Sequence, residues 1–299
     1  EEGITNADVY LSQNDGTLMT MEYARRYPIL TVACGPTNSI RGASYLSSLK
    51  DAIVIDVGGT TTDLGVIQNG FPRESSVAVT IGGVRTNFRM PDVVSIGLGG
   101  GSIVRQHPDG SVTVGPDSVG YEITSKALVF GGDVMTATDI AVRLGMVALG
   151  DASRVQDIPQ ELAQKAMDAI RTLVEDAIDA MKVSSADSDV ILVGGGSIIL
   201  PEKLAGAANV VKPEHFGCAN AIGSAISKVS GTFEKLINYD ELPREQALAQ
   251  AKDEAVEIAV AAGAVRDTVE IIEVEDVPLA YYPGNTNRVK IKAAGDLRA

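Results

Sequence analysis

Short apolar runs separated by glycine-rich turns fill most of the chain, and stretches with helical spacing lie between them. The runs 53–55 and 64–67 are rich in β-branched residues and flank a short turn, a pattern that predicts a β-hairpin. The run 190–193 predicts a buried strand that leads into a glycine turn opening a helix. Other short strands are expected at 9–11, 77–81, 92–96, 111–114 and 209–211.

Helices are expected where apolar residues recur every three or four positions. From Leu162 to Met181 the opposite face is acidic, which predicts an amphipathic helix on a sheet, with Pro159 in its first turn. A helix beginning near Thr20 is expected to be broken by Gly35-Pro36-Thr37. Further helices are expected at 38–49, 138–148, 217–228 and 244–262, with strands at 268–274 and 288–291 after them.

The composition limits the classes of partner. The 299 residues include no tryptophan and only 4% aromatic residues, so the core is expected to be aliphatic. A formal net charge of −14 argues against nucleic acid and against an anionic membrane surface. No uncharged apolar run approaches the ~20 residues of a membrane helix. Cys34 and Cys218 form no Cys-x-x-Cys motif, so we expect a cytoplasmic protein with Cys34 as a small buried apolar residue.

The turn of the predicted hairpin carries the residue types of a phosphate site. Its sequence is Asp56-Val57-Gly58-Gly59-Thr60-Thr61-Thr62-Asp63. The two glycines permit positive φ, and backbone N–H groups in such a turn can form a nest for an anion. Each of the three threonine hydroxyls can donate to a phosphate oxygen. The two aspartates would repel bare phosphate, so they indicate that Mg²⁺ lies between carboxylate and phosphate, or that one of them orients a water.

Two further glycine clusters accompany the hairpin. Gly194-Gly195-Gly196 follows the buried strand, where a base or ribose can lie against backbone and a helix start favours an anion. The segment 97–102 contains Gly99 and Gly100, but its spacing is wrong for a dinucleotide fingerprint. We expect it to approach the site closely, with ligand contact and simple packing both open. The residues after it predict a hairpin around Pro108-Asp109-Gly110.

Asp139 has two candidate roles. It lies in the first turn of a predicted helix, where a carboxylate suits the helix dipole. It is also a candidate ligand for the cation, together with Asp56. Capping of the helix is the favoured role.

The motifs together resemble the hydantoinase/oxoprolinase family, whose fold is similar to that of the sugar kinases, actin and the heat-shock ATPases. The resemblance covers about residues 10–230, and the motifs follow the order of the family. They are Gln13-Asn14-Asp15-Gly16-Thr17-Leu18-Met19, Cys34-Gly35-Pro36, the segment 56–63, the segment 97–102, Val114-Gly115-Pro116-Asp117-Ser118, Thr138-Asp139 and Gly194-Gly195-Gly196.

The resemblance implies an α/β fold of the actin-like ATPase (ribonuclease H-like) type, with a mixed sheet flanked by helices. It implies that residues 56–63 are the second of two phosphate hairpins and that residues 194–196 are the adenosine turn. No second Asp-x-Gly-Gly-Thr is present and the chain begins at Glu1, so we expect a C-terminal fragment of a longer protein. Residues 1–240 are expected to form the ATPase domain and 241–299 a small α+β appendage.

The chain departs from the large hydantoinase subunits at two places. It has Asp92-Val93-Val94 where they carry Asp-Ile-His, and it runs through 119–125 without their Pro-Gly-Pro-Ala-Cys-Tyr-Gly loop. Both departures argue against carrying the metal site of those subunits over to this chain, and they leave the identity of the substrate undetermined.

Three functions follow from the resemblance. The first is ATP-dependent hydrolysis of a small cyclic amide or imide, with ATP and Mg²⁺, with Asp56 and Asp63 in the catalytic roles, and with a homo-oligomer or partner subunit expected. The second is a non-catalytic nucleotide-binding or regulatory relative. The third is a kinase for a small metabolite, with Asp63 or Asp139 as the general base.

Overall fold

The computed structural model describes residues 7–75, 80–81, 83–85, 90–182 and 184–298. The chain divides into two compact units, one formed by residues 35–224 and the other by residues 1–34 together with 225–299. This division differs in position from the boundary near residue 240 that the sequence predicts, because the N-terminal segment shares a sheet with the C-terminal segment. The assignment of functional domains remains a prediction.

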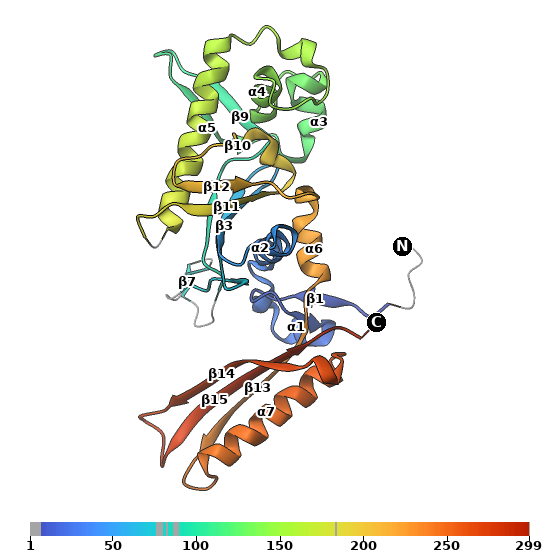
Figure 1. Ribbon diagram of the computed structural model, residues 1–299, viewed down its shortest axis with the longest axis vertical. Coiled ribbons are helices and arrows are strands. Elements are labelled where there is room, and N and C mark those ends of the chain that lie inside the picture. Colours follow the sequence, from blue (N-terminus) through green and yellow to red (C-terminus); the bar gives the residue numbers. More distant parts are fainter. Residues whose placement is uncertain (1–6, 76–79, 82, 86–89, 183, 299) are drawn as a thin grey trace. The chain divides into compact units, whose positions relative to one another are not determined.

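A mixed six-stranded sheet is the centre of unit 35–224 (Figure 1). Its strands run in the order β12-β11-β3-β4-β5, with β8 paired to β4; the parallel pairs are β12/β11 and β11/β3, and the others are antiparallel. Their bounds are β3 Ala52–Val57, β4 Thr62–Gln68, β5 Phe71–Pro72, β8 Val93–Ile96, β11 Ser188–Val193 and β12 Ala207–Val211. The predicted hairpin, buried strand and edge strand are therefore confirmed.

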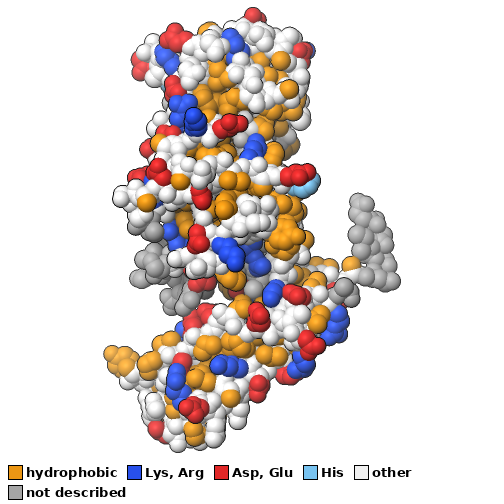
Figure 2. Space-filling view, in the orientation of Figure 1, with side chains coloured by type: hydrophobic (Ala, Val, Ile, Leu, Met, Phe, Trp, Pro, Cys, Tyr) orange, Lys and Arg blue, Asp and Glu red, His pale blue; other side chains and the backbone are white. Residues whose placement is uncertain are grey.

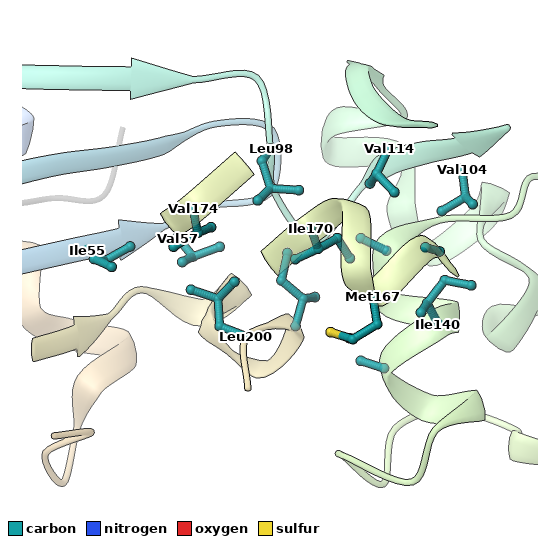
Figure 3. Packing of buried hydrophobic residues seen from close by; sticks show 14 of the residues in the cluster. Ile55, Val57, Leu98, Val104, Val114, Ile140, Met167, Ile170, Val174 and Leu200 are labelled. Atoms are coloured by element: carbon teal, nitrogen blue, oxygen red, sulfur yellow. The ribbon is translucent and has the colours of Figure 1, made fainter. Parts of the chain in front are cut away.

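Helices cover both faces of this sheet. Ile53, Ile55 and Val57 point to the face that packs with α5 (Gln160–Met181), and Val54 packs on the other face with α2 (Cys34–Ser47) and α6 (Ala219–Ala225). Because both faces are buried, β3 is apolar at nearly every position. Figure 3 shows α5 residues such as Ile170 and Val174 against Val57 and Leu98.

Smaller elements complete this unit. The ribbon of β9 and β10 follows the glycine segment and confirms the predicted hairpin at residues 104–114. The elements are β6 Thr80–Ile81, β7 Val84–Arg85, β9 Ser102–Gln106, β10 Val112–Ser118, η2 Gly120–Glu122, α3 Ile123–Lys126, η3 Leu128–Phe130, α4 Ala137–Arg143, η4 Ala152–Val155, η5 Gly195–Ile199 and η6 Phe216–Cys218. The strand predicted at 77–81 falls mostly outside the described residues.

The second unit is a five-stranded sheet with one long helix. The strand order is β1-β2-β13-β15-β14, and α7 packs its alanine stripe (Ala247, Ala251, Ala255 and Ala259) against the sheet (Figure 1). The bounds are β1 Tyr10–Ser12, β2 Leu18–Thr20, α1 Met21–Arg26, η1 Pro28–Thr31, β13 Val229–Asn238, α7 Arg244–Ala261, η7 Arg266–Thr268, β14 Glu270–Pro278 and β15 Thr286–Gly295. A Cβ at Gly231 would lie 2.3 Å from Ala259 N, so glycine permits this close approach.

Several predicted helix boundaries are wrong. The first helix ends at Arg26, and Gly35-Pro36-Thr37 lies in the first turn of α2 instead of breaking a helix. Proline is tolerated there because the first N–H groups of a helix have no partner within it. The helix expected at 138–148 ends at Arg143, close to Gly145 in the left-handed region (φ 73°). Pro159 precedes α5 as its N-cap residue.

Among the described residues, no helix is long and apolar enough to cross a membrane. Both cysteines are free, and Cys34 is only half-buried, so the expected burial of its side chain is wrong. On the face shown in Figure 2, lysines and arginines are interspersed with acidic and apolar side chains.

Candidate functional site: a turn backed by glycine segments

The carbonyl groups of the hairpin turn between β3 and β4 accept hydrogen bonds that fix the turn in place. Gly58 N donates to Thr61 O at 2.9 Å and closes the turn. Gly58 O accepts from Gly100 N at 3.0 Å, and Gly59 O accepts from Gly101 N at 2.7 Å. The carbonyl oxygens of the turn are thus directed to the glycine segment 97–101, which confirms that this segment approaches the turn closely.

Only glycine fits where the segments meet. A Cβ on Gly99 would lie 2.5 Å from Thr60 N, and one on Gly196 would lie 2.2 Å from Gly58 O. Gly194 has a φ of 83°, and a Cβ there would lie 2.2 Å from Asp56 Oδ1. All three glycine clusters therefore converge on one turn, because backbone can approach backbone this closely only without side chains.

The exposed side of the turn carries backbone N–H groups that have no hydrogen-bond acceptor among the described residues. Gly59, Thr60 and Thr61 are exposed, and within the described part of the chain their backbone N–H groups donate no hydrogen bond. Consecutive free N–H groups in a turn suit an anion. The predicted phosphate-binding role of Gly58, Gly59, Thr60 and Thr61 is compatible with this arrangement.

Thr62 has a different environment from the other two threonines. Its side chain is fully buried, and its hydroxyl donates to Leu98 O at 2.7 Å. That hydroxyl fixes the glycine segment and is not directed to a ligand. The expectation that all three threonines contact phosphate therefore fits only Thr60 and Thr61.

Gly99 and Gly100 are buried behind the turn. Gly100 O accepts from both the N–H and the hydroxyl of Thr138, at 3.0 and 2.8 Å. Ser102 Oγ accepts from Gly99 N at 2.8 Å. Of the two roles left open for this segment, packing is the one that these contacts favour. Gly195, in contrast, is exposed, and no atom lies within 4 Å of a Cβ built on it.

Asp56 and Asp63 face each other across the hairpin. They are register partners in β3 and β4, both are half-buried, and both line a small hollow with Pro36 and Ile40 of α2. Burial raises the pKa of Asp56, the Ser39 hydroxyl opposes the rise, and the negative charge of Asp63 adds to it. Ser95 Oγ donates to Asp63.

Within the described part of the chain neither Asp56 nor Asp63 forms an ion pair, and two carboxylates that face each other in this way fit a hard divalent cation. Mg²⁺ is commonly bound by one or two carboxylates, with waters and phosphate oxygens completing its shell. In the described residues no group of three or more His, Cys, Asp or Glu side chains forms a complete metal cage. Asp56 and Asp63 are thus suited to a cation shared with a phosphate ligand.

Asp139 has a structural environment. Its side chain is fully buried, and Oδ2 accepts from Thr136 N and Thr136 Oγ1 at 2.7 and 2.8 Å. Its other oxygen accepts from Val129 N at 2.7 Å. Thr136 and Asp139 form a capping box at the start of α4, as the favoured sequence interpretation has it. These contacts do not favour the alternative role of metal ligand.

Sequence reasoning missed the polar residues that support the turn. Ser118 Oγ donates to Gly59 O at 3.3 Å. Ser39 contacts Asp56, Ser95 contacts Asp63, and Asn220 donates to Ser39. Ser118 belongs to a recognised motif, but the other three carry no sequence signal. A larger cavity of about 340 Å³ lies at the other end of β3 and is lined by residues such as Asp51 and Met181, away from these carboxylates.

Comparison with known proteins agrees with this architecture. The family described as hydantoinase/oxoprolinase matches residues 1–151, about half of the chain. The chain therefore belongs to the hydantoinase/oxoprolinase family.

Among curated relatives, the gamma subunit of acetophenone carboxylase from Aromatoleum aromaticum is 31% identical over 117 residues, 38% of this chain and 16% of that protein. Caprolactamase subunit alpha from Pseudomonas jessenii is 25% identical over 223 residues, 71% of this chain and 30% of that subunit. The matches thus span less than a third of either relative.

Two solved structures share the fold. The nucleotide-free structure of acetone carboxylase, described as ATP-dependent, gives a TM-score of 0.72 at 17% identity and covers 99% of this chain and 53% of that one. The ATP-dependent caprolactamase of Pseudomonas jessenii gives 0.67 at 17% identity, with 96% and 53% covered. The predicted fold class is confirmed, and the chain spans about half the length of these structures.

Proposed function

We propose that the chain is part of an ATP-dependent enzyme that opens a small cyclic amide or imide. The observation that carries the proposal is the turn of residues 58–61. The carbonyls of Gly58 and Gly59 accept from the glycine segment, and the N–H groups of Gly59, Thr60 and Thr61 donate no hydrogen bond among the residues that the structure describes. Asp56 and Asp63 flank this turn. Relatives named as an ATP-dependent lactamase and ATP-dependent carboxylase support the use of ATP.

In this proposal the turn holds the terminal phosphates of ATP. The free N–H groups and the hydroxyls of Thr60 and Thr61 contact phosphate oxygens, and Asp56 and Asp63 hold Mg²⁺. The backbone at Gly195 provides space for the adenosine. Preorganised donors of this kind stabilise charge that develops on the transferred phosphoryl group.

The proposed reaction has two stages, activation of the amide by ATP and hydrolysis of the activated ring. The terminal phosphoryl group passes from ATP to the amide oxygen, which turns that oxygen into a leaving group and gives ADP. Water then adds to the activated carbon, and the ring C–N bond breaks with proton transfer to nitrogen, which leaves an acyl phosphate. A second water hydrolyses the acyl phosphate to the carboxylate and inorganic phosphate. Asp63, beside Ser95 and the turn, is the proposed residue for orienting the water.

The proposal is tested with the whole protein that carries this chain. Phosphate release from ATP should depend on the addition of a cyclic amide or imide, and Asp56→Asn should lower the rate by about 100-fold or more. Asp176→Asn, on the exposed face of α5, is the matched control and should change nothing. Amide-dependent turnover that survives in Asp56→Asn would remove Asp56 from the site.

A second candidate is a nucleotide-binding regulator without turnover. It is favoured by Val93 and Val94, which replace the Ile-His of the larger subunits and lie in β8 against β4 as partly buried apolar residues. This function predicts ATP binding with no phosphate release across a panel of lactams, hydantoins and imides. A stable phosphorylated metabolite would instead indicate the kinase.

A further inference from the structure

A chain of polar side chains from two helices ends at the carboxylate of Asp56. It runs from Asn220 in α6 through Ser39 in α2. Asp56 lies on the sheet face covered by α2 and α6 and lines a hollow with Pro36 and Ile40 of α2. Burial raises the pKa of Asp56, and the hydroxyl of Ser39, which lies between those two positions in α2, is the hydrogen-bonding group that opposes the rise. Ser39 is 1% exposed, so its hydroxyl has no access to bulk water. Asn220 Nδ2 of α6 in turn donates to Ser39 Oγ at 3.1 Å.

Asn220 also contacts the carbonyl that would be the usual alternative acceptor for Ser39. A serine inside a helix commonly donates its hydroxyl to the carbonyl four residues earlier, which for Ser39 is Gly35 O. Here Asn220 Nδ2 donates to that carbonyl at 2.9 Å. The hydroxyl has one proton to donate, and because Ser39 Oγ accepts from Asn220 Nδ2, that proton is not used in the contact with Asn220. The proton of Ser39 stays available for Asp56, the acceptor whose rise in pKa it opposes.

The two helices are held in register at this contact. A Cβ on Gly42 would lie 1.9 Å from Ala219 O, and a Cβ on Gly223 would lie 1.8 Å from Asn38 O. Backbone packing this close leaves α6 little freedom to slide along α2. Asn220, although largely exposed, is thereby kept within reach of Ser39.

We propose that Ser39 and Asn220 are positioning residues that fix the carboxylate of Asp56 for the cation of the nucleotide site. The inference rests on the proposed function, since it assigns these residues to the same site. Neither residue touches the turn itself in the described contacts, so both act through Asp56.

The test measures Mn²⁺ binding, by electron paramagnetic resonance, to the whole protein with a non-hydrolysable ATP analogue. Loss of a charge-assisted hydrogen bond should weaken Mn²⁺ binding about tenfold in Ser39→Ala. Asn220→Asp, which loses both donors and offers Ser39 a competing carboxylate, should weaken it to a similar extent. Ser39→Thr keeps the hydroxyl and should restore binding to within about twofold.

Matched controls come from the same helix and the same sheet. Ser44 Oγ donates to Leu49 O in α2, and Asn209 Nδ2 donates to Asp189 at the far end of β11. Ser44→Ala and Asn209→Asp should leave Mn²⁺ binding unchanged. The double variant Ser39→Ala/Asn220→Asp should be no weaker than Ser39→Ala alone, because Asn220 acts through Ser39.

Additive losses in the double variant, wild-type Mn²⁺ binding in Ser39→Ala, or failure of Ser39→Thr to restore binding would each overturn the inference. A second readout separates it from the proposed function. The NMR resonance of the Asn220 side-chain amide should shift in Asp56→Asn and in Ser39→Ala, whether or not nucleotide binds. An unchanged resonance in Asp56→Asn contradicts the contact even if the protein binds ATP.

Discussion

Two regions of this chain hold a partly buried motif carboxylate, and they differ in how its charge is compensated. In the sheet that joins the two ends of the chain, Asp15 contacts the Lys292 ammonium and accepts from Thr17 N and Thr17 Oγ1 at 3.0 and 2.8 Å. In the other unit, Asp56 faces a second carboxylate, Asp63, and has one serine hydroxyl beside it.

The pKa directions follow from these contacts. Burial alone would raise the pKa of Asp15, but Lys292 and the Thr17 donors lower it below its ordinary value. The pKa of Asp56 is raised because burial and Asp63 outweigh Ser39. A carboxylate whose charge is neutralised internally holds the fold together, whereas one left without compensation is suited to a cation from outside. This contrast favours residues 56–63 as the functional site.

The largest expected effect is on the compensated region. Lys292 is 5% exposed and the Asp15 side chain is 27% exposed, so Lys292→Met leaves a mostly buried carboxylate without its cation. We expect the free energy of unfolding to fall by about 3 kcal/mol, the lower end of the cost of breaking a buried ion pair from one side. Urea unfolding measures it, with the exposed Lys203→Met as control. A loss below about 1 kcal/mol, typical of a surface pair, would remove the contrast between the two regions.

The next effect concerns the glycines behind the turn. Gly196→Ala places a Cβ 2.2 Å from Gly58 O, and the forced shift should cost about 2 kcal/mol. Gly195→Ala meets no atom within 4 Å, so the fold should keep its stability. Nucleotide affinity, measured by calorimetry, should fall in both variants if Gly195 faces the adenosine. Equal thermal midpoints for the two variants would contradict the backbone contact.

A smaller effect separates the structural threonine from those assigned to phosphate. Thr62→Val leaves Leu98 O without its donor in a buried place, which should cost about 1–2 kcal/mol. Thr61→Val changes an exposed side chain and should leave stability within about 0.5 kcal/mol while weakening ATP binding. If Thr61→Val destabilises the fold as much as Thr62→Val, the division of roles among the threonines is wrong.

The sequence predicted the features that depend on neighbours in the chain. The hairpin of residues 53–67 and the buried strand at 190–193 follow from β-branched runs bounded by glycine. The glycine segments also indicated close approach, because glycine is needed where backbone meets backbone. Even so, the pattern did not distinguish Thr62 from Thr60 and Thr61. Strand alternation decides which hydroxyl points inward, and a turn boundary shifted by one residue reverses the assignment.

Long-range pairing was not predictable from these patterns. β2 pairs with β13, more than 200 residues later, and no local signal in Leu18–Thr20 indicates that partner. Ser39 and Asn220 were missed for the same reason, since a serine and an asparagine in two helices gain a role only once packing brings them to Asp56. Asp139 was placed correctly at a helix start because a capping box is a local motif.

The smallest expected effect is on the pH dependence of the uncompensated region. Because the pKa of Asp56 is raised above its ordinary value of 3.8, the folded state binds a proton more tightly than the unfolded state. This group's contribution to stability is therefore greatest below pH 3.8 and is lost as the pH rises through the folded pKa.

Asp63→Asn removes one cause of the raised pKa, so the pKa of Asp56 should move down toward 3.8. The stability lost as the pH rises should then be smaller than in the wild type. Carboxyl ¹³C NMR titration of Asp56 measures the shift, and Asp176→Asn is the control for removing one charge elsewhere. If the pKa of Asp56 is the same in Asp63→Asn as in the wild type, the two carboxylates do not interact electrostatically. The proposal that one cation binds both carboxylates would then lose its electrostatic basis.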